Sequence, residues 1–142
     1  MVLDLEHVEY IKKRASKNIH FDLIISDNSQ YLKTNICIEL FSWVLENILK
    51  NSIDSIQTDG KISISVNSTD KNIILDFIDN GKGILRSNFK NIFEPGYTSK
   101  KRGWGLGLSL SKRIIEEYHQ GRIFVLKSTP FKETIIRIVL KN

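Results

Sequence analysis

The chain has 142 residues, of which 41% are hydrophobic and 26% charged, a composition that excludes fibrous and disordered classes and allows one globular domain with a sizeable core. Its single cysteine excludes an internal disulfide framework and is typical of a reducing compartment. No apolar run approaches the roughly 20 residues of a membrane span, so we expect a cytoplasmic domain, whose parent protein can still be membrane-anchored.

The net charge of +5 is modest, and much of the excess lies in one stretch beside a glycine-rich turn. The basic residues concerned are Lys100, Lys101, Arg102, Lys112 and Arg113. A local anion such as a triphosphate explains this cluster as well as a nucleic-acid backbone does.

The first half of the chain predicts two helices around one strand. Apolar spacing indicates a short helix within Leu3–Ala15, and strict alternation over Asn18–Ser26 predicts a strand. A 3.6-residue period predicts a long amphipathic helix over Asn35–Ile56. Its apolar stripe consists of Ile36, Leu40, Val44, Leu45, Ile48, Leu49, Ile53 and Ile56.

The middle of the chain predicts a hairpin and then a long loop. Asp59-Gly60 is interpreted as the tight turn of a hairpin formed by Lys61–Asn67 and Asn72–Ile78. Residues 81–102 lack clear periodicity and are expected to form a long loop with one short helix near Ser87–Ile92.

The last part of the chain predicts a helix and two strands. Helical spacing over Leu106–Tyr118 is followed by Gly121, at the place of a helix C-terminal glycine. Two strands, Ile123–Lys127 and Thr134–Leu140, close the chain. Together the elements predict an α+β fold: a two-layer sandwich with a mixed sheet of about five strands, covered on one face by about three helices.

Two asparagines form the first candidate site. Asn47 and Asn51 lie one helical turn apart, so their side chains share a helix face. Amide oxygens are hard, neutral ligands that can bind Mg²⁺ beside phosphate oxygens and water. Taken alone, the pair is better explained as two solvated amides.

A carboxylate and two glycines form the second. Asp79 follows an apolar strand directly, and there it can accept a hydrogen bond from an exocyclic amine such as that of adenine. Gly81 and Gly83 permit positive φ and close approach of a base to the backbone. In isolation, this segment is simply a good turn.

The third and fourth candidates are a loop and a glycine-rich turn. Phe93 and Tyr97 flank Glu94-Pro95-Gly96; they are either packing aromatics of an ordered loop or anchors of a movable lid, whose Thr98 and Lys100 reach phosphates on closure. Gly103, Gly105 and Gly107 open the next helix, where bare N–H groups favour an anion. Both the P-loop pattern and the βαβ context of a dinucleotide fold are missing from the sequence.

In this order, the four blocks resemble the N, G1, F and G2 boxes of sensor histidine kinases, in the GHKL ATPase superfamily. The resemblance covers roughly residues 35–140 and implies a Bergerat ATP-binding fold with ATP and Mg²⁺ as cofactors. It implies that Asn51 holds Mg²⁺, that Asp79 binds the adenine amine, and that the segment from Phe93 to Gly103 is an ATP lid. Thr134 matches a threonine that supports the adenine through a water.

The resemblance also implies a full site. The nucleotide-binding residues are Asn47, Lys50, Asn51, Asp79, Gly81, Gly83, Ile84, Phe93, Tyr97, Thr98, Lys100, Gly103, Gly105, Leu106, Gly107, Leu108 and Thr134, with Asn47 and Lys100 as catalytic residues and Asn51 as metal ligand. Two positions depart from the family pattern. Glu133 stands where a glycine commonly precedes the threonine, and Asp54 where many kinases have a lysine.

The resemblance favours phosphoryl transfer over hydrolysis. Gyrase-type and chaperone-type members place a Glu general base four residues before the metal Asn, where this chain has Asn47, and Glu46 is rotated about 100° away on the helix. The expected activity is therefore that of a protein-histidine kinase. A stand-alone Ser kinase of the anti-sigma type and an ATP-gated binding or dimerisation module remain as alternatives.

The phosphoacceptor of that family is a His followed by an acidic residue, and His7 is followed by Val8. We therefore expect residues 1–15 to be the tail of a linker from a dimerisation domain and residues 16–142 to be the ATP-binding domain. The implied partners are the His-containing dimerisation domain of the same protein, in a homodimeric parent, and indirectly a response regulator. Neither nucleic acid nor direct membrane contact is expected.

Overall fold

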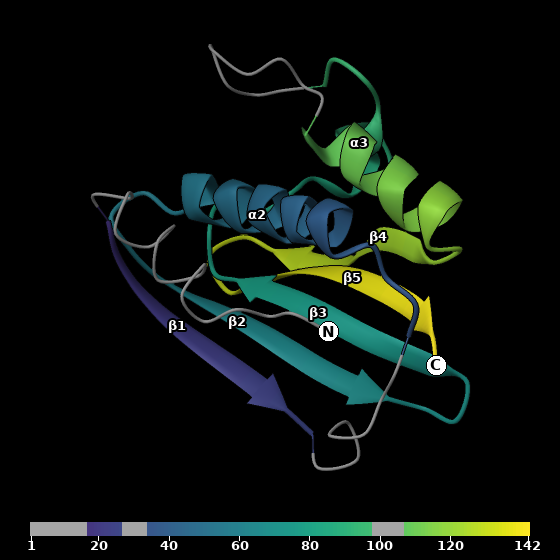
Figure 1. Cartoon of the computed structure of the whole chain (residues 1–142). Coiled ribbons are helices and arrows are strands. Elements are labelled where there is room, and N and C mark those ends of the chain that lie inside the picture. Colours follow the sequence, from purple (N-terminus) through teal and green to yellow (C-terminus); the bar gives the residue numbers. More distant parts are fainter. Residues whose placement is uncertain (1–16, 27–33, 98–106) are drawn as a thin grey trace.

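The computed structural model describes residues 17–26, 34–97 and 107–142, which form a five-stranded open sheet with helices on one face (Figure 1). The strands are β1 (Asn18–Ile25), β2 (Asp59–Ser68), β3 (Asn72–Asp79), β4 (Arg122–Thr129) and β5 (Glu133–Lys141), in the spatial order β1-β2-β3-β5-β4. β1 pairs with β2 in parallel, whereas the other neighbours are antiparallel. The predicted α+β sandwich with a mixed sheet is confirmed.

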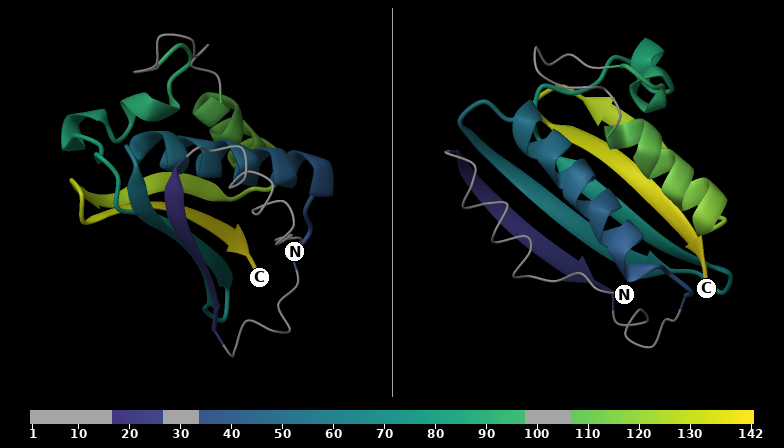
Figure 2. Two further views of the ribbon diagram at one scale, coloured as in Figure 1. Left: turned by 90° about the vertical axis from the view of Figure 1, so that its left-hand side faces the viewer. Right: turned by 45° about the horizontal axis from the view of Figure 1, so that its top comes forward.

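In the described part of the chain, α2 (Ile38–Ser55) and α3 (Gly107–Arg113) form the second layer. α2 is the predicted long helix, and α3 continues into a π-helix, η4 (Ile114–Tyr118). They pack against each other over the same face of the sheet, as the right-hand view of Figure 2 shows. The short helix predicted near Ser87–Ile92 is present as two 3₁₀ turns, η2 (Arg86–Asn88) and η3 (Asn91–Phe93). The helix predicted within Leu3–Ala15 lies outside the described residues.

The core lies between α2 and the inward-facing residues of the sheet. Among its largest fully buried side chains are Phe41 and Ile48 of α2 and Leu75 and Phe77 of β3. Each such side chain contributes roughly 1.5–3 kcal/mol through burial. Because this apolar stripe fixes the rotation of α2, the helix holds Asn47 and Asn51 half-buried at the edge of the core.

The apolar alternation of β1 is only partly reflected in its burial. Ile19 is buried and Phe21 and Leu23 are half-buried, but Ile25 is exposed. Among the described strands, β1 lies at the edge of the sheet and pairs with β2 alone, so its end at Ile25 receives less cover.

The hairpin is confirmed, but the turn predicted for it is wrong. Asp59 and Gly60 are the first residues of β2, paired with β1, and the chain reverses between Ser68 and Asn72 instead. There the Thr69 N–H donates to the Asn72 carbonyl at 2.9 Å. A dipeptide of turn-forming residues thus begins a strand, because the parallel neighbour supplies its hydrogen bonds.

The helix end near Gly121 also differs from the prediction. The left-handed residue is Gln120, with φ 49°, and its neighbour Gly121 has no positive φ. Gly121 is needed for close packing instead, because a Cβ there would lie 2.5 Å from the Val139 carbonyl oxygen of β5. The Gly121 N–H closes the wide helix end by donating to the Ile115 carbonyl at 2.9 Å.

The turn between β4 and β5 contains a strained residue. Phe131 has φ 60° and an exposed ring, while its N–H donates to the Gly81 carbonyl at 2.8 Å. A left-handed conformation costs a bulky residue roughly 1–2 kcal/mol and costs glycine almost nothing.

Phe131→Gly is therefore expected to raise the free energy of unfolding by about 0.5–1 kcal/mol, since little apolar burial is lost. Urea unfolding followed by circular dichroism measures the change. Lys132→Gly, at the next and equally exposed turn position without a positive φ, is the control and is expected to lower stability. A loss of stability in Phe131→Gly would contradict the strain argument.

Candidate functional site

Polar side chains converge where β3 ends beneath α2. Asp79, the last residue of β3, stands opposite Thr134 near the start of β5, and both are buried. Ser52 and Ser55, in the last turn of α2, lie above the Asp79 carboxylate. Two strand ends and one helix end therefore form the site (Figure 1).

The Asp79 carboxylate is held as a hydrogen-bond acceptor. Its Oδ1 accepts the Gly81 N–H at 2.9 Å and the Ser55 hydroxyl at 3.2 Å. Burial raises the pKa of Asp79 above its ordinary value, while hydrogen bonds from Gly81, Ser52 and Ser55 act in the opposite direction. A carboxyl group that gives up hydration in this way is suited to a ligand that brings its own donor.

The glycine loop after Asp79 is fixed on two sides. The Lys82 N–H donates to the Ser55 carbonyl at 2.9 Å, and the Gly81 carbonyl accepts the Phe131 N–H. A Cβ on Gly81 would overlap the Ser55 side chain, and Gly83 has φ +83°. Both glycines are thus required by the structure, Gly81 by space and Gly83 by backbone conformation.

A pair of hydroxyls joins this loop to the sheet. Ser128 Oγ accepts the Ile84 N–H at 2.9 Å and lies 2.7 Å from Thr134 Oγ1. Thr134 and Ile84 were predicted from the sequence, whereas Ser128 and Ser55 were missed. An isolated serine in a strand or a helix end gives no local signal, so only the tertiary structure reveals these two.

The two asparagines of α2 are oriented by their amide nitrogens. Nδ2 of Asn47 donates to the Trp43 carbonyl and Nδ2 of Asn51 to the Asn47 carbonyl, each at 2.8 Å. These bonds leave the Oδ1 atoms as the side-chain groups suited to a ligand. Oδ1 of Asn47 lies against the first residue of α3, 2.8 Å from where a Cβ of Gly107 would stand, so a side chain at Gly107 would be in collision.

Two charged residues lie on the same helix. Lys50 Nζ forms an ion pair with Glu46 Oε1 at 3.1 Å and is largely exposed. Lys50 lies within one turn of Asn47 and Asn51 on α2. Its ion pair is with Glu46, on the same helix, and so does not involve Asp79.

The remaining predicted residues fall into two groups. Phe93 is buried in the core at η3, as a packing aromatic, whereas Tyr97 is exposed. Ile84 and Leu108 are half-buried against the core. Predicted site residues outside the described part of the chain are Thr98, Lys100, Gly103, Gly105 and Leu106.

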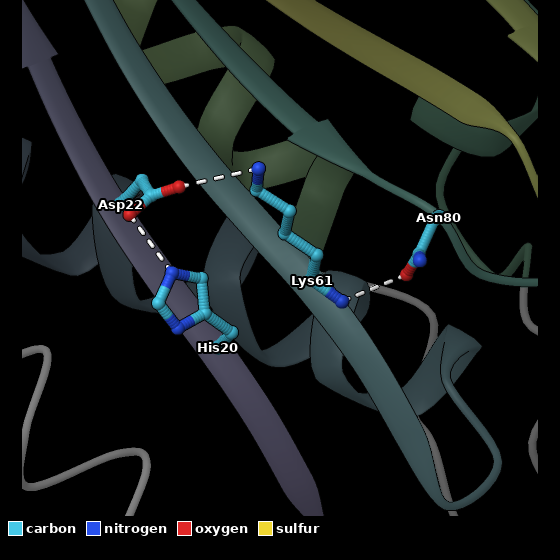
Figure 3. A network of polar contacts seen from close by, with 4 residues as sticks. All are labelled: His20, Asp22, Lys61 and Asn80. Carbon is cyan, nitrogen blue, oxygen red and sulfur yellow. Dashed lines mark hydrogen bonds and ion pairs between the residues drawn. The ribbon is translucent and has the colours of Figure 1, made fainter.

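A polar network on the face of the sheet opposite α2 holds Asn80, which precedes Gly81 of the glycine loop (Figure 3). Asn80 Oδ1 accepts the Lys61 N–H at 2.8 Å, and the Asn80 N–H donates back to the Lys61 carbonyl. Lys61 Nζ in turn pairs with Asp22, which also contacts His20, and the hydrogen bond from Lys61 lowers the pKa of Asp22. The residue after Asp79 is thereby tied to β2.

Within residues 17–26, 34–97 and 107–142, no three His, Cys, Asp or Glu side chains are grouped closely enough to hold a metal ion. The Asn51 amide oxygen, with its nitrogen already bonded, fits a hard cation that takes its other ligands from a phosphorylated ligand and water.

A buried carboxylate lies beside a glycine loop and under a helix with two aligned amides, an arrangement that can hold a nucleotide. The family model of histidine kinase-, DNA gyrase B- and HSP90-like ATPases matches residues 38–142. The chain belongs to this family of ATP-binding domains. Within the described residues, no helix has the length and hydropathy needed to cross a membrane.

Its curated relatives include several kinases. The chain is 41% identical over 127 residues to Sporulation kinase E of Bacillus subtilis, covering 89% of this chain and 16% of that protein. It is 35% identical over 139 residues to the histidine-protein kinase AtoS of Escherichia coli, covering 97% of this chain and 23% of that protein. The chain therefore spans less than a quarter of the length of either relative.

Solved structures confirm the fold. The mycobacterial sensor histidine kinase MprB superposes with a TM-score of 0.80 at 23% identity, covering 96% of this chain and 89% of that one. A catalytic domain of histidine kinase ThkA gives a TM-score of 0.78 at 23% identity, covering 96% and 92%.

Proposed function

We propose that this chain is the catalytic domain of a two-component sensor histidine kinase and transfers the γ-phosphoryl group of ATP to a His on a separate dimerisation domain. The observation that carries the proposal is Asp79, buried opposite Thr134 and held as an acceptor at the end of the helix that bears Asn47 and Asn51. Family membership and the sensor-kinase relatives support the same activity.

The adenine base of ATP is recognised at Asp79. Asp79 accepts a hydrogen bond from the exocyclic amine of adenine, Thr134 stands beside it, and the loop of Gly81, Gly83 and Ile84 lies along the base. The fixed, glycine-lined loop supports this role, because a side chain at Gly81 would displace Ser55 from the carboxylate.

The phosphates lie along α2, toward the start of α3. Asn51 contributes its amide oxygen to Mg²⁺, and Asn47 and Lys50 lie near the phosphates. When bound, Mg²⁺ neutralises phosphate charge and polarises the transferred group. The contact between Asn47 and Gly107 supports this arrangement, since it brings the first turn of α3 to the asparagine face of α2.

The lid residues complete the proposed site. Phe93 anchors its base within the core, and Tyr97 follows on the surface. Thr98, Lys100, Gly103, Gly105 and Leu106 are proposed to close over the phosphates with Gly107 and Leu108, Lys100 acting with Asn47 in catalysis.

The site favours transfer to a protein side chain over hydrolysis. Asn47 has no basic group to activate a water, and the neighbouring carboxylate of Glu46 is engaged with Lys50 at 3.1 Å. No observation in the described part of the chain favours the anti-sigma-type Ser kinase or the ATP-gated module.

The proposal includes the surroundings of the domain. Residues 1–15 are the tail of the linker from the dimerisation domain, the parent protein is a homodimer, and a response regulator receives the phosphoryl group from the His. The domain works in the cytoplasm, where ATP is supplied.

Reconstitution tests the function. The chain is incubated with γ-labelled ATP and Mg²⁺, alone and together with a purified sensor-kinase dimerisation domain that carries a His-Glu phosphoacceptor. We expect label on that His only when both proteins are present, and none on the chain alone. A dimerisation domain with the His replaced by Ala is the control. Label on His7 of the isolated chain, or on serine of the partner, would contradict the proposal.

A further inference from the structure

Ser128 connects three parts of the candidate site. It lies on β4, its Oγ accepts the Ile84 N–H of the glycine loop, and it is 2.7 Å from Thr134 Oγ1 on β5. Thr134 is 3% exposed and pairs in register with Asp79. The Ser128 hydroxyl thus joins the loop to both strands, next to the residue that stands opposite Asp79.

The hydrogen bond from Ile84 to Ser128 favours one direction for the bond between Ser128 and Thr134. A serine hydroxyl has a single proton to donate, and Oγ of Ser128 already accepts the Ile84 N–H. Accepting one bond polarises the group and strengthens its own O–H as a donor. Either oxygen of the Ser128–Thr134 pair can be the donor. When Ser128 donates to Thr134 Oγ1, the Thr134 proton is left for a ligand.

The glycine loop packs directly against Ser128. Gly83 has φ +83°, and a Cβ there would stand 3.0 Å from Ser128 Oγ and 3.1 Å from Pro130 Cα. No larger residue fits without moving Ser128. Consequently Ser128 sets the distance between the loop and β4.

We propose that Ser128 is a positioning residue that makes Thr134 a hydrogen-bond donor and so selects a 6-amino purine over a 6-oxo purine. This inference rests on the proposed ATP site. Adenine presents an amine donor next to a ring-nitrogen acceptor, and the site presents the complementary pair: the Asp79 acceptor beside the Thr134 donor, acting directly or through one water. A 6-oxo purine reverses both groups and leaves buried partners unmatched, which is an effective basis for rejection.

The test compares ATP with inosine triphosphate (ITP), which differs from ATP in these two groups. The 142-residue chain, Ser128→Ala and Ser128→Thr are titrated with each nucleotide by calorimetry. We expect Ser128→Ala to weaken ATP binding by about tenfold and to change ITP binding by less than about twofold, which removes most of the preference for ATP. Ser128→Thr, which keeps the hydroxyl, is expected to retain the preference.

A matched control separates selectivity from stability. Ser63→Ala removes a buried serine hydroxyl from β2 and is expected to leave the ATP/ITP ratio unchanged. If Ser128→Ala does not fold, Thr134→Val removes the proposed donor at nearly constant shape and is expected to show the same loss of preference.

The outcomes also separate this inference from the proposed function. A wild-type chain that binds neither nucleotide overturns both. A wild-type chain that prefers ATP, with an unchanged ratio in Ser128→Ala, overturns only the role of Ser128, as does equal weakening of both nucleotides.

Discussion

Replacing Asp79 with Asn is expected to weaken ATP binding by about 30-fold or more and, at the same time, to stabilise the domain without nucleotide. The loss follows because the amide cannot offer the same charged acceptor to the adenine amine. Calorimetry with ATP and Mg²⁺ measures it. Binding that stays within about twofold of the wild type would refute the assignment of Asp79 to the base.

The gain in stability follows from the burial of the carboxyl group. Burial raises the pKa of Asp79 in the folded state, so the stability linked to its protonation is present below the ordinary Asp pKa and is lost as the pH rises through the raised value. The amide of the Asp79→Asn variant would stay neutral throughout. The stability difference between Asp79→Asn and the wild type is therefore expected to widen from acidic to neutral pH, as urea unfolding at several pH values would show.

The structure can accommodate the amide. The amide oxygen of the variant can take the place of Oδ1, which accepts the Gly81 N–H at 2.9 Å and lies 3.2 Å from Ser55 Oγ, while the amide nitrogen takes the place of Oδ2. Asp76→Asn is the matched control, since Asp76 lies on the same strand but pairs with Arg137 at 2.8 Å on the open face. That variant is expected to keep ATP binding and lose some stability.

Asn51→Ala is expected to reduce phosphoryl transfer by about 100-fold or more and to abolish the dependence of ATP binding on Mg²⁺. The side chain supplies the only metal ligand proposed from this chain, and its nitrogen bond to the Asn47 carbonyl is a minor part of helix stability. Titration of ATP with and without Mg²⁺, together with the reconstituted transfer reaction, measures both effects.

Two further variants complete that experiment. Glu46→Gln, on the same helix, is expected to leave slow background hydrolysis unchanged, because Glu46 is not the base that activates water in this site. Asn51→Asp keeps an oxygen ligand and is expected to regain part of the Mg²⁺ effect. Mg²⁺ dependence that survives in Asn51→Ala would place the metal elsewhere.

Local periodicity was sufficient for much of the fold. The 3.6-residue stripe of α2 and the alternation of β2 and β3 arise because each element buries one face. The pattern is visible in the sequence because the residues that share a face are only two to four positions apart. The Asp79, Gly81 and Gly83 positions were likewise predictable, because a carboxylate at a strand end followed by two glycines is a local pattern.

Turn chemistry was less reliable than periodicity. Asp59-Gly60 has the composition of a turn, yet it begins β2, because hydrogen bonding to β1 outweighs its local preference. Gln120 adopts the left-handed conformation that the sequence favoured for Gly121, since Gly121 is required against β5. In both cases a distant strand decided the conformation.

The sequence alone therefore determined most of the described elements, the family and the candidate residues to test, because each depends on patterns within a few positions. Only the tertiary structure decided which hydroxyls complete the site. Ser55 reaches Asp79 across 24 positions, and Ser128 reaches Ile84 across 44. The residues next to a serine do not indicate such a distant partner, because the packing of helix, loop and sheet determines which groups its hydroxyl can reach.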